Sequence, residues 1–328
     1  MFNNQIILVT GGTGSWGHEL VKQLLTYKPK EIRIFSRNES NQFKMKQEFD
    51  NNPKLRFLIG DIKEKDTLIE ACQGVDYIFH LAALKHVPVC EEQPIEALKT
   101  NVNGTKNVID AAIQCNVHKV VYISTDKASN PVNFYGMTKA MGERLIIHAN
   151  TFNTKTRFVC IRGGNVLGTN GSVIHIFKKQ IKEKGKIGIT DVEMTRFFLA
   201  IEDAIKLVFK AVSESIGGEI FVMKMPSCKI VDLADVLVNS SHTENIEFEI
   251  LGIRPGEKIH ELLISEYEAK QTISYDEKYF VILPSVPPKY LNEHYSQYKL
   301  INLSNYNSSK GLMTKDEIEK MLKKGRFI

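Results

Sequence analysis

Tyr135 and Lys139 form the first pair of residues whose spacing suggests chemistry. They stand four positions apart in Tyr135-Gly136-Met137-Thr138-Lys139, and on a helix such residues share one face. An ammonium beside a phenol stabilises the phenolate and lowers its pKa, so Tyr135 could act as a general base near neutral pH. The same spacing also arises by chance on exposed helix faces, so the pair needs support from its surroundings.

A second group of reactive side chains, Thr125, Asp126 and Lys127, follows the apolar run 120–124. If that run is a strand of a parallel sheet, these side chains lie beyond its carboxyl end, where such sheets bind ligands. Adjacent Asp and Lys side chains perturb each other's pKa, which suits one to act as acid and the other as base. The alternative is a local ion pair that caps a loop, because perturbed pairs also occur outside active sites.

A glycine-rich loop follows the apolar run 6–10 and leads into a helical pattern. Its glycines Gly11, Gly14 and Gly17 have the spacing of a dinucleotide-binding loop. There the first glycine permits a tight turn, the second lets the backbone approach the pyrophosphate, and the third lets helix pack closely on strand. Glycines also mark ordinary turns, but the strand–loop–helix context favours a dinucleotide site.

The residues after the second predicted strand, 32–36, indicate which dinucleotide binds. NAD-binding proteins usually carry a carboxylate there, which bonds the ribose 2′-OH, whereas an Arg accommodates the 2′-phosphate of NADP. This sequence has Ser36-Arg37-Asn38 and no carboxylate at that point. We therefore expect NADP in preference to NAD, and the alternative for Arg37 is an ordinary exposed surface charge.

Alternating apolar strands and amphipathic helices predict the fold that would position these groups. Near-continuous apolar runs that alternate with helices are typical of a parallel sheet covered on both faces. The predicted strands are 6–10, 32–36, 55–59, 75–81, 120–124 and 157–162, and the predicted helices are 14–27, 39–50, 95–114 and 135–150. We expect an α/β fold in which residues 1–165 form a Rossmann-like, doubly wound parallel sheet with the cofactor site and the catalytic residues.

The pattern becomes irregular after about residue 165. Helices are expected at 173–184, 202–215 and 231–239, and short strands at 219–223 and 246–251. Residues 166–328 are therefore expected to form mainly a smaller α+β substrate-binding cap and a C-terminal tail, with some chain crossing back to the first domain.

The bulk composition narrows the class of protein. The 328 residues carry 43 Lys and Arg against 38 Asp and Glu, a formal charge of +5, without a basic tract rich in aromatics, so nucleic-acid binding is not supported. The five cysteines are scattered, with no Cys-x-x-Cys pair, so neither a disulfide framework nor a metal site is expected. No apolar run approaches the ~18 residues of a membrane helix, and the start does not resemble a signal peptide. We expect a cytoplasmic protein without membrane association.

Taken together, these motifs resemble those of the extended short-chain dehydrogenase/reductases. More narrowly, the chain resembles bacterial UDP-N-acetylglucosamine 4,6-dehydratases of polysaccharide and pseudaminate-type biosynthesis, nearly from end to end. The segments that carry the resemblance are Thr10–Ser15, Ser36-Arg37, Gly60-Asp61, Ala82–Pro88, Lys99–Asn101, Ser124–Ala128, Asn130-Pro131, Asn133, Tyr135-Gly136, Thr138-Lys139, Gly164–Val166, Gly171–Val173, Met194–Phe197 and Gly252–Lys258. Thr-Asp-Lys-Ala together with the later Arg-Pro-Gly-Glu-Lys is highly diagnostic of this group.

The resemblance implies a mechanism that suits these residues. Tyr135, helped by Lys139 and Thr125, would take the proton of the sugar C4 hydroxyl while hydride passes to NADP⁺. The C4 ketone acidifies the C5 hydrogen, which Lys127 would remove. Asp126, if protonated, would donate to the C6 hydroxyl as it departs as water. Return of hydride to C6 then gives a 4-keto-6-deoxy sugar for surface glycan or nonulosonate biosynthesis.

The resemblance also implies the residues that bind cofactor and substrate. The cofactor would be held by Gly11, Thr13, Gly14, Ser15, Trp16, Gly17, Ser36, Arg37, Asp61, Ile62, Ala82, Ala83, Lys85, Tyr135 and Lys139. The substrate would be held by Lys85, His86, Asn165, Val173, Thr195, Arg196, Arg254 and Glu257. Structural pairing is the alternative for Arg196 and Glu257, and a buried histidine without a ligand is the alternative for His86.

Two positions depart from the family pattern. Gly163 stands where many relatives have Tyr, and Asn170 stands where many have Arg, which leaves the substrate pose and the face of C5 reprotonation open. The combination of Asp126, Lys127 and Tyr135 favours inversion at C5. Retention at C5 and release of a 5,6-ene are the alternatives.

Two other functions would fit the same scaffold. A UDP-hexose or UDP-N-acetylhexosamine 4-epimerase also needs Tyr135 and Lys139, but it has no use for an Asp–Lys pair at a strand end. A non-catalytic NADP-sensing protein of this fold tends to lose the tyrosine, which is present here. The resemblance also implies a homo-oligomer, either a hexamer or a dimer.

Overall fold

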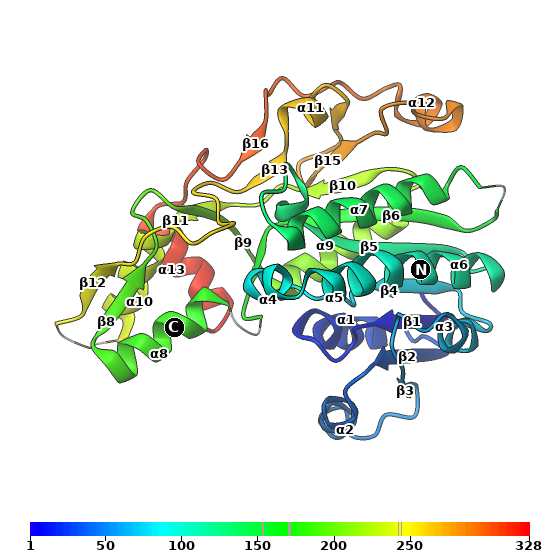
Figure 1. Cartoon of the computed structure of the whole chain (residues 1–328), viewed down its shortest axis with the longest axis horizontal. Helices are drawn as coiled ribbons and strands as arrows, with labels where there is room; N and C mark the ends of the chain where they lie inside the picture. Colours follow the sequence, from blue (N-terminus) through cyan, green and yellow to red (C-terminus); the bar gives the residue numbers. More distant parts are fainter. Residues whose placement is uncertain (153, 170–171, 242, 244) are drawn as a thin grey trace.

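A nine-stranded sheet dominates the computed structural model, which describes residues 1–152, 154–169, 172–241, 243 and 245–328 (Figure 1). The strand order within these residues is β14-β15-β10-β6-β5-β4-β1-β2-β3. The strands are β1 (Ile6–Thr10), β2 (Glu31–Ser36), β3 (Leu55–Ile59), β4 (Tyr77–His80), β5 (Lys119–Thr125), β6 (Arg157–Gly163), β10 (Ile220–Met223), β14 (Thr272–Ser274) and β15 (Tyr279–Ile282). All strands from β3 to β10 in this order run parallel, and β15 and β14 add an antiparallel edge.

The order of the parallel strands decides where a ligand can bind. The chain starts in the middle of the sheet at β1, moves outward through β2 to β3, and then returns past β1 to β4, β5 and β6. The order in which the chain adds strands to the sheet therefore reverses between β1 and β4, although these two strands are parallel. Doubly wound sheets bind ligands in the crevice at such a point, beyond the carboxyl ends of the strands. The predicted Rossmann-like fold is confirmed.

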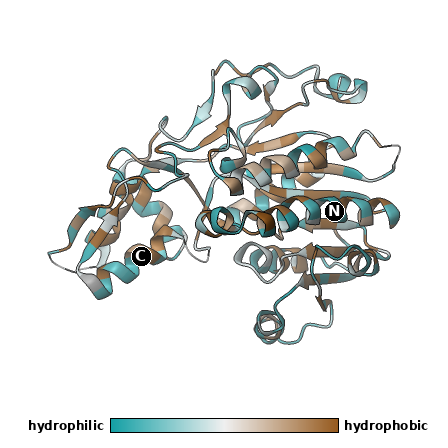
Figure 2. Ribbon diagram, viewed as in Figure 1, coloured by the Kyte–Doolittle hydropathy of each residue, from teal (hydrophilic) through white to brown (hydrophobic). Residues whose placement is uncertain are grey.

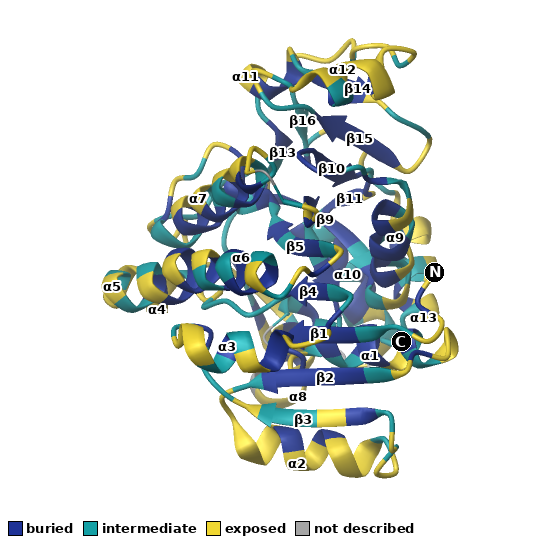
Figure 3. Cartoon of the chain, turned by 90° about the vertical axis from the view of Figure 1, so that its right-hand side faces the viewer, coloured by how far each residue is buried: buried dark blue, intermediate teal, exposed yellow. Residues whose placement is uncertain are grey.

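Helices cover both faces of this sheet, as Figure 3 shows in a view turned from that of Figure 1. On one face α1 (Ser15–Thr26) packs on α9 (Ile201–Glu214). On the other face α6 (Gly104–Gln114) packs against α3 (Lys65–Cys72) and α7 (Phe134–Ala149). Figure 2 shows hydrophobic residues along the strands between these layers. Burial on both sides explains why the strands are near-continuous apolar runs.

The predicted helix 95–114 is divided in the structure. It begins as α5 (Pro94–Leu98), passes through a π-helical turn at Lys99–Asn103 and continues as α6. This turn carries Asn101, whose amide exchanges hydrogen bonds with both backbone groups of Leu84, at 2.8 and 2.9 Å, and donates to Thr138 Oγ1 at 2.9 Å. The irregular turn thereby fixes the loop after β4 against α7, and such turns are frequent at functional sites.

The second half of the chain builds a smaller lobe, which lies at the left of Figure 1. Within the described residues, its strands are β7 (Asn165–Leu167), β9 (Thr195–Ala200) and β11 (Ser227–Lys229) in one sheet, and β8 (Lys186–Ile189) with β12 (Glu247–Ile250) in another. Its helices are α8 (Val173–Lys184), α10 (Ile230–Ser241) and α13 (Lys315–Lys324). Ile174, Leu233 and Leu322 belong to its hydrophobic core, which is separate from that of the main sheet.

The chain also returns from this lobe to the main sheet. α9 lies on the face of the sheet, β10 pairs in parallel with β6, and β15 pairs with β10. The remaining elements are α2 (Glu39–Glu48), α4 (Val87–Glu92), α11 (Glu266–Ala269), α12 (Lys289–Tyr295), β13 (Leu262–Ile264) and β16 (Tyr306–Asn307). The domain boundary at residues 165/166 stays a prediction.

Among the described residues, no helix combines the length and apolarity needed to cross a bilayer.

One buried arginine ties several of these segments together. Arg162 on β6 is 1% exposed. Its Nε and Nη2 donate to Glu143 on α7 at 3.0 and 2.6 Å, and its Nη2 and Nη1 donate to Glu268 on α11 at 2.8 and 3.1 Å. Nη1 also donates to Leu263 O at 2.9 Å. Burial opposes ionisation of Glu268, but Arg162 and Ser265 outweigh it and lower its pKa to about 2.

Removal of this guanidinium should destabilise the protein severely. In Arg162→Ala, Glu143 and Glu268 lose their cation inside the fold, which we expect to reduce the free energy of unfolding by about 3–5 kcal/mol. Because the pKa of Glu268 is about 2 instead of 4.5, its ionised form adds stability that is present above about pH 4.5 and lost as the pH falls toward 2. Urea unfolding across this range should show that acid dependence in the unmodified protein and its loss in the variant.

The control is Arg56→Ala, which removes an exposed arginine from β3. It should change the free energy of unfolding by less than about 0.5 kcal/mol. Equal destabilisation by the two substitutions would contradict the role given to Arg162.

Candidate active site

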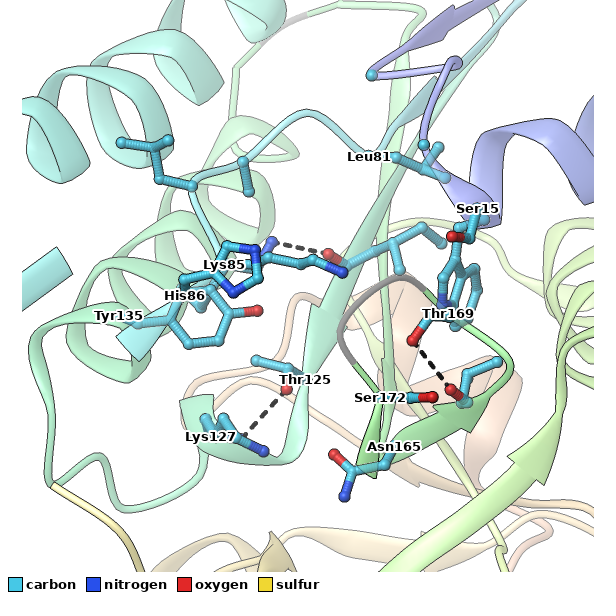
Figure 4. A pocket seen from close by; sticks show the side chains of 18 of the residues that line it. Ser15, Leu81, Lys85, His86, Thr125, Lys127, Tyr135, Asn165, Thr169 and Ser172 are labelled. Carbon is cyan, nitrogen blue, oxygen red and sulfur yellow. Dashed lines mark hydrogen bonds between the residues drawn. The ribbon is translucent and has the colours of Figure 1, made fainter. Parts of the chain in front are cut away.

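A cavity of about 790 Å³ opens between the main sheet and the smaller lobe, at the switch point between β1 and β4. Its volume is in the range of pockets that bind small molecules. Every residue predicted to bind cofactor lines it, as do the predicted site residues Thr125, Lys127, His86, Asn165, Val173, Arg196, Arg254 and Glu257. Figure 4 shows Lys85, His86, Tyr135, Thr125 and Lys127 along one side, opposite Ser15, Thr169 and Ser172.

The glycine-rich loop reaches the cavity because its glycines permit close backbone contacts. Gly11 has a φ of +70°, and a Cβ there would lie 2.8 Å from the backbone of Ala82. A Cβ on Gly17 would lie 2.3 Å from Gly12 O, so a larger residue would push α1 away from the loop. Gly14 begins α1 without a side-chain cap. The first turn of α1 therefore presents backbone N–H groups that suit an anionic ligand.

The end of β2 supplies a second polar region of the cavity. Ser36 Oγ accepts a hydrogen bond from Gln42 Nε2 at 3.0 Å. Arg37 Nη1 lies 3.8 Å from Asp61 Oδ2, and the arginine side chain is 56% exposed. A guanidinium held this loosely can turn to a phosphate group, which it binds through two parallel hydrogen bonds.

Tyr135 and Lys139 lie on successive turns of α7, as predicted. Asn133 caps this helix by accepting a first-turn N–H at 2.7 Å, which starts the helix just before Tyr135. Lys139 Nζ donates to Ile123 O at 2.7 Å. Burial lowers the pKa of Lys139 to about 8. The lysine is thus fixed between α7 and β5, with a charge that is lost at mildly alkaline pH.

The prediction that Tyr135 has a lowered pKa is wrong. Burial raises the pKa of Tyr135 to about 12, and the largest effects that oppose this rise come from Lys127 and the hydrogen bond with Thr125. The ammonium of Lys139 instead lies 3.9 Å from the centroid of the Tyr122 ring and points to the β5 backbone. The cost of desolvating the phenolate therefore outweighs the stabilisation that neighbouring groups give it, and Tyr135 is held as a neutral phenol.

Asp126 and Lys127 lie in the turn after β5. Lys127 Nζ donates to Asp126 Oδ1 at 3.0 Å, and Thr125 Oγ1 donates to the same oxygen at 2.9 Å. Asp126 is fully buried, and its Oδ2 has no hydrogen-bond partner. Thr125 and Lys127 line the cavity, whereas Asp126 lies behind them. The predicted acid is therefore linked to the cavity through the Thr125 hydroxyl.

Sequence reasoning missed a third ionisable group here, Glu261. Its Oε1 lies 3.2 Å from Lys127 Nζ and 3.5 Å from Arg196 Nε, and the residue is 3% exposed. Burial opposes ionisation of Glu261, but Lys127 and Arg196 outweigh it and lower its pKa. Burial also acts to lower the pKa of Lys127, but Asp126 and Glu261 raise it overall, so Lys127 is an ammonium. Glu261 comes soon after the Arg-Pro-Gly-Glu-Lys motif, in a segment without helical spacing that could have indicated its role.

That motif reaches the cavity because it is anchored to the segment before α7. Asn133 Nδ2 donates to Gly256 O and Lys258 Nζ donates to Ser129 O, both at 2.8 Å. Arg254 Nη1 lies 3.9 Å from an oxygen of the neighbouring Glu257, and the arginine side chain is 62% exposed. This loose pair leaves Arg254 able to bind a diphosphate.

Thr195 does not reach the cavity, so its predicted contact with substrate is wrong. Neighbouring residues of a strand point to opposite faces. Arg196 of β9 faces the cavity, and Thr195 therefore points away. Its Oγ1 is hydrogen-bonded with His260 Nδ1 at 2.9 Å and with Ser308 Oγ at 2.7 Å.

The departure at Gly163 also lies away from the cavity lining. A Cβ on Gly163 would lie 3.2 Å from Met223 Sδ and 3.8 Å from Met225 Sδ. These two methionines therefore occupy the space into which a side chain at this position would point. The other departure, Asn170, and the neighbouring Gly171 lie outside the described residues.

Comparisons with known proteins place the chain among related families and folds. Residues 7–283 match the family model described as "Polysaccharide biosynthesis protein". The chain is 47% identical to the UDP-N-acetylglucosamine 4,6-dehydratase (inverting) of Campylobacter jejuni, over 87% of this chain and 85% of that protein. It is 43% identical to the UDP-glucose 4-epimerase of Rickettsia rickettsii, over 82% of this chain and 80% of that protein. The X-ray structure of Pen from Bacillus thuringiensis matches with a TM-score of 0.91 at 39% identity, over 98% of this chain and 99% of that one.

Alanine substitutions at Gly17 and Gly14 should separate folding from dinucleotide binding. Gly17→Ala forces a methyl group onto Gly12 O, and we expect a loss of about 1–3 kcal/mol or more in stability. Gly14→Ala should leave the melting temperature nearly unchanged, because its Cβ would lie at an acceptable 3.4 Å from Gly11 O. Its added methyl group should nevertheless weaken dinucleotide binding at least about tenfold, because it blocks the phosphate approach.

Thermal melting and fluorescence titration measure the two effects. Trp16 is the single tryptophan of the chain and lines the cavity, so its emission reports on ligand binding. Normal dinucleotide affinity in Gly14→Ala would show that the loop does not hold the phosphates.

Proposed function

The chain belongs to the polysaccharide biosynthesis protein family, and we propose that it is a nucleotide-sugar 4,6-dehydratase that acts on UDP-N-acetylglucosamine. The membership confirms the family resemblance predicted from the motifs. The observation that carries the proposal is one cavity that Tyr135, Thr125 and Lys127 line together, where Tyr135 interacts with the other two (Figure 4). Asp126 lies directly behind them and is hydrogen-bonded to both Thr125 and Lys127. The product is a UDP-4-keto-6-deoxy-N-acetylhexosamine for surface glycan or nonulosonate biosynthesis.

The acid–base pair is what favours a dehydratase over an epimerase. Epimerisation at C4 needs a group that moves the proton of the C4 hydroxyl, which Tyr135 can do alone. Loss of water between C5 and C6 needs an additional base and an additional acid. Lys127 and Asp126 meet that requirement at 3.0 Å from each other. An epimerase remains the second candidate because a relative of that name is 43% identical to this chain.

A nicotinamide dinucleotide fits the cavity between the glycine-rich loop and Tyr135. Gly14 leaves the approach to the N-terminus of α1 open, and Ser36 and Arg37 suit a ribose 2′-phosphate. We propose NADP because β2 ends in these residues without a carboxylate. Held by the glycine-rich loop, Ser36 and Arg37, the oxidised cofactor would supply a positive charge and a reversible hydride acceptor for the sugar.

Tyr135 takes the proton of the C4 hydroxyl in this proposal. With a pKa of about 12, Tyr135 is a neutral phenol at neutral pH. Positive charge near a phenol favours the phenolate, so Tyr135 becomes a base only when the cavity is filled. Lys127 and Thr125 already act to lower the pKa of Tyr135.

Lys127 and Asp126 carry out the elimination. Lys127 faces the cavity and takes the C5 proton. The Thr125 hydroxyl, which donates to Asp126 Oδ1 in the structure, turns in this step to accept the Asp126 proton and gives its own to the departing C6 hydroxyl. We propose inversion at C5 in preference to retention, since the dehydratase relative at 47% identity is named as inverting.

Incubation with UDP-N-acetylglucosamine in D₂O tests this function. We expect a 4-keto-6-deoxy product with deuterium at C5, because the C5 proton exchanges with solvent during elimination and return. NMR of the product identifies the deuterium, and its coupling constants give the C5 configuration. Recovery of unchanged substrate, or of the C4 epimer alone, would contradict the proposal.

Within the same experiment, Lys127→Ala should abolish product formation, since general acid–base catalysis contributes about 10²–10⁴-fold. Lys320→Ala, which removes an exposed lysine from α13, should leave the rate unchanged. Full dehydration by Lys127→Ala would show that another group is the base.

Arg37→Ala should separate NADP from NAD. Loss of a charged hydrogen bond to the 2′-phosphate costs about 1.5–3 kcal/mol, so the NADP affinity should fall at least about tenfold. The affinity for NAD, which lacks this phosphate, should change little. Isothermal titration with both cofactors gives the comparison, and an equal loss for both would refute the preference for NADP.

A further inference from the structure

An isolated Asp126–Lys127 pair would hold its protons in the wrong places for elimination. At 3.0 Å, the stable form of such a pair is a carboxylate beside an ammonium. Elimination needs the reverse, a carboxylic acid that can protonate the leaving hydroxyl and an amine that can remove the C5 proton. A further group in contact with the pair can resolve this conflict.

Glu261 is in the position to do so. Because its Oε1 lies 3.2 Å from Lys127 Nζ, the ammonium lies between two buried carboxylates. Asp126 Oδ2 and Glu261 Oε2 are both buried without a hydrogen-bond partner. Two ionised carboxylates with bare oxygens are costly in such a site, which favours an added proton. Since Arg196 Nε faces Glu261 at 3.5 Å, that proton belongs on Asp126.

We propose that Glu261 is a positioning residue that keeps Asp126 protonated and, with substrate in the cavity, accepts the proton of Lys127 after oxidation at C4. In this step, an N–H bond of Lys127 Nζ breaks, an O–H bond forms at Glu261 Oε1, and the ion pair becomes a neutral pair. Exclusion of water by the substrate favours the neutral pair over the ion pair. A substrate diphosphate near Arg196 also offsets the charge that otherwise keeps Glu261 ionised.

The resulting protonation states suit the dehydration proposed above, on which this inference rests. The Lys127 amine takes the C5 proton and becomes an ammonium. Asp126 gives its proton through Thr125 to the C6 hydroxyl, which leaves as water. Because the cluster gains one proton and loses one, its total charge does not change during elimination.

Several other groups also act on the pKa of Asp126. Burial is the largest effect and raises it, Lys127 lowers it, and Glu261 raises it again. Tyr135, Lys258 and Arg196 interact electrostatically with the same cluster. Tyr135 is neutral and the other two are cations, so Glu261 supplies the negative charge that raises the pKa.

Glu261→Gln tests the inference because it removes the proton acceptor and its charge but keeps the side-chain length. In single turnovers with UDP-N-acetylglucosamine, oxidation at C4, followed by the absorbance of reduced cofactor, should stay within about threefold of the unmodified enzyme. Elimination, followed by deuterium at C5, should slow at least about tenfold. The pH above which elimination declines should fall by about one unit or more, because Asp126 loses a negative neighbour and its pKa drops.

Glu219→Gln is the matched control. Glu219 is also a fully buried glutamate, but it precedes β10 at the end of the sheet away from the cavity and accepts a hydrogen bond from Tyr295. Its replacement should leave the pH dependence of elimination unchanged. Glu261→Asp keeps a carboxylate and should recover part of the elimination rate relative to the glutamine variant. If the glutamine variant does not fold, the aspartate variant, with its shorter reach, should show the same selective loss of elimination to a smaller degree.

The outcomes separate this inference from the proposed function. An unchanged pH dependence in the Glu261 variants, or an equal loss of oxidation and elimination, would overturn the role of Glu261. If the unmodified enzyme forms neither reduced cofactor nor product, the proposed function fails instead.

Discussion

The buried guanidinium of Arg162 holds α7 and the returning second half of the chain against the main sheet. Arg162 of β6 binds Glu143 on α7 and Glu268 on α11, and it also donates to Leu263 O. α7 carries the tyrosine and lysine of the site, and Glu261 lies two residues before Leu263. In a dry interior these partners cannot separate without leaving a charge unpaired. The two halves of the chain are thereby held in one geometry around the cavity.

Burial, more than local spacing, decides the protonation states in this cavity. It raises the pKa of Tyr135 to about 12 and lowers that of Lys139 to about 8. At Lys127, neighbouring charges of opposite sign outweigh the effect of burial, so this side chain stays an ammonium between Asp126 and Glu261. In the proposed dehydration, these protonation states change only when a ligand alters the surrounding charge and excludes water. The lysine and the aspartate, which are in contact, then serve as base and acid.

Much of the first half of the fold was predictable because its signals are local. β1, the helix after the glycine-rich loop and α7 begin and end within about a residue of their predicted bounds. The irregular turn at Lys99–Asn103 was not predictable, since its sequence is compatible with a continuous helix. The contact predicted for Thr195 failed because strand alternation places it opposite Arg196. Glu261 was missed because it lies far along the chain from Lys127 and meets it only in the folded molecule.

The sequence by itself determined the class of fold and the glycine-rich loop, and it indicated the candidate reactive residues from Thr125 to Lys139. These features depend on periodicity, on glycine spacing and on neighbours within a few positions, which are properties of the chain alone. The tertiary structure decided which of these side chains face the cavity, which charges surround them and therefore which protons they carry. Such properties depend on burial and on contacts between distant segments, as in the ion pair of Lys127 with Glu261, and no local pattern encodes them.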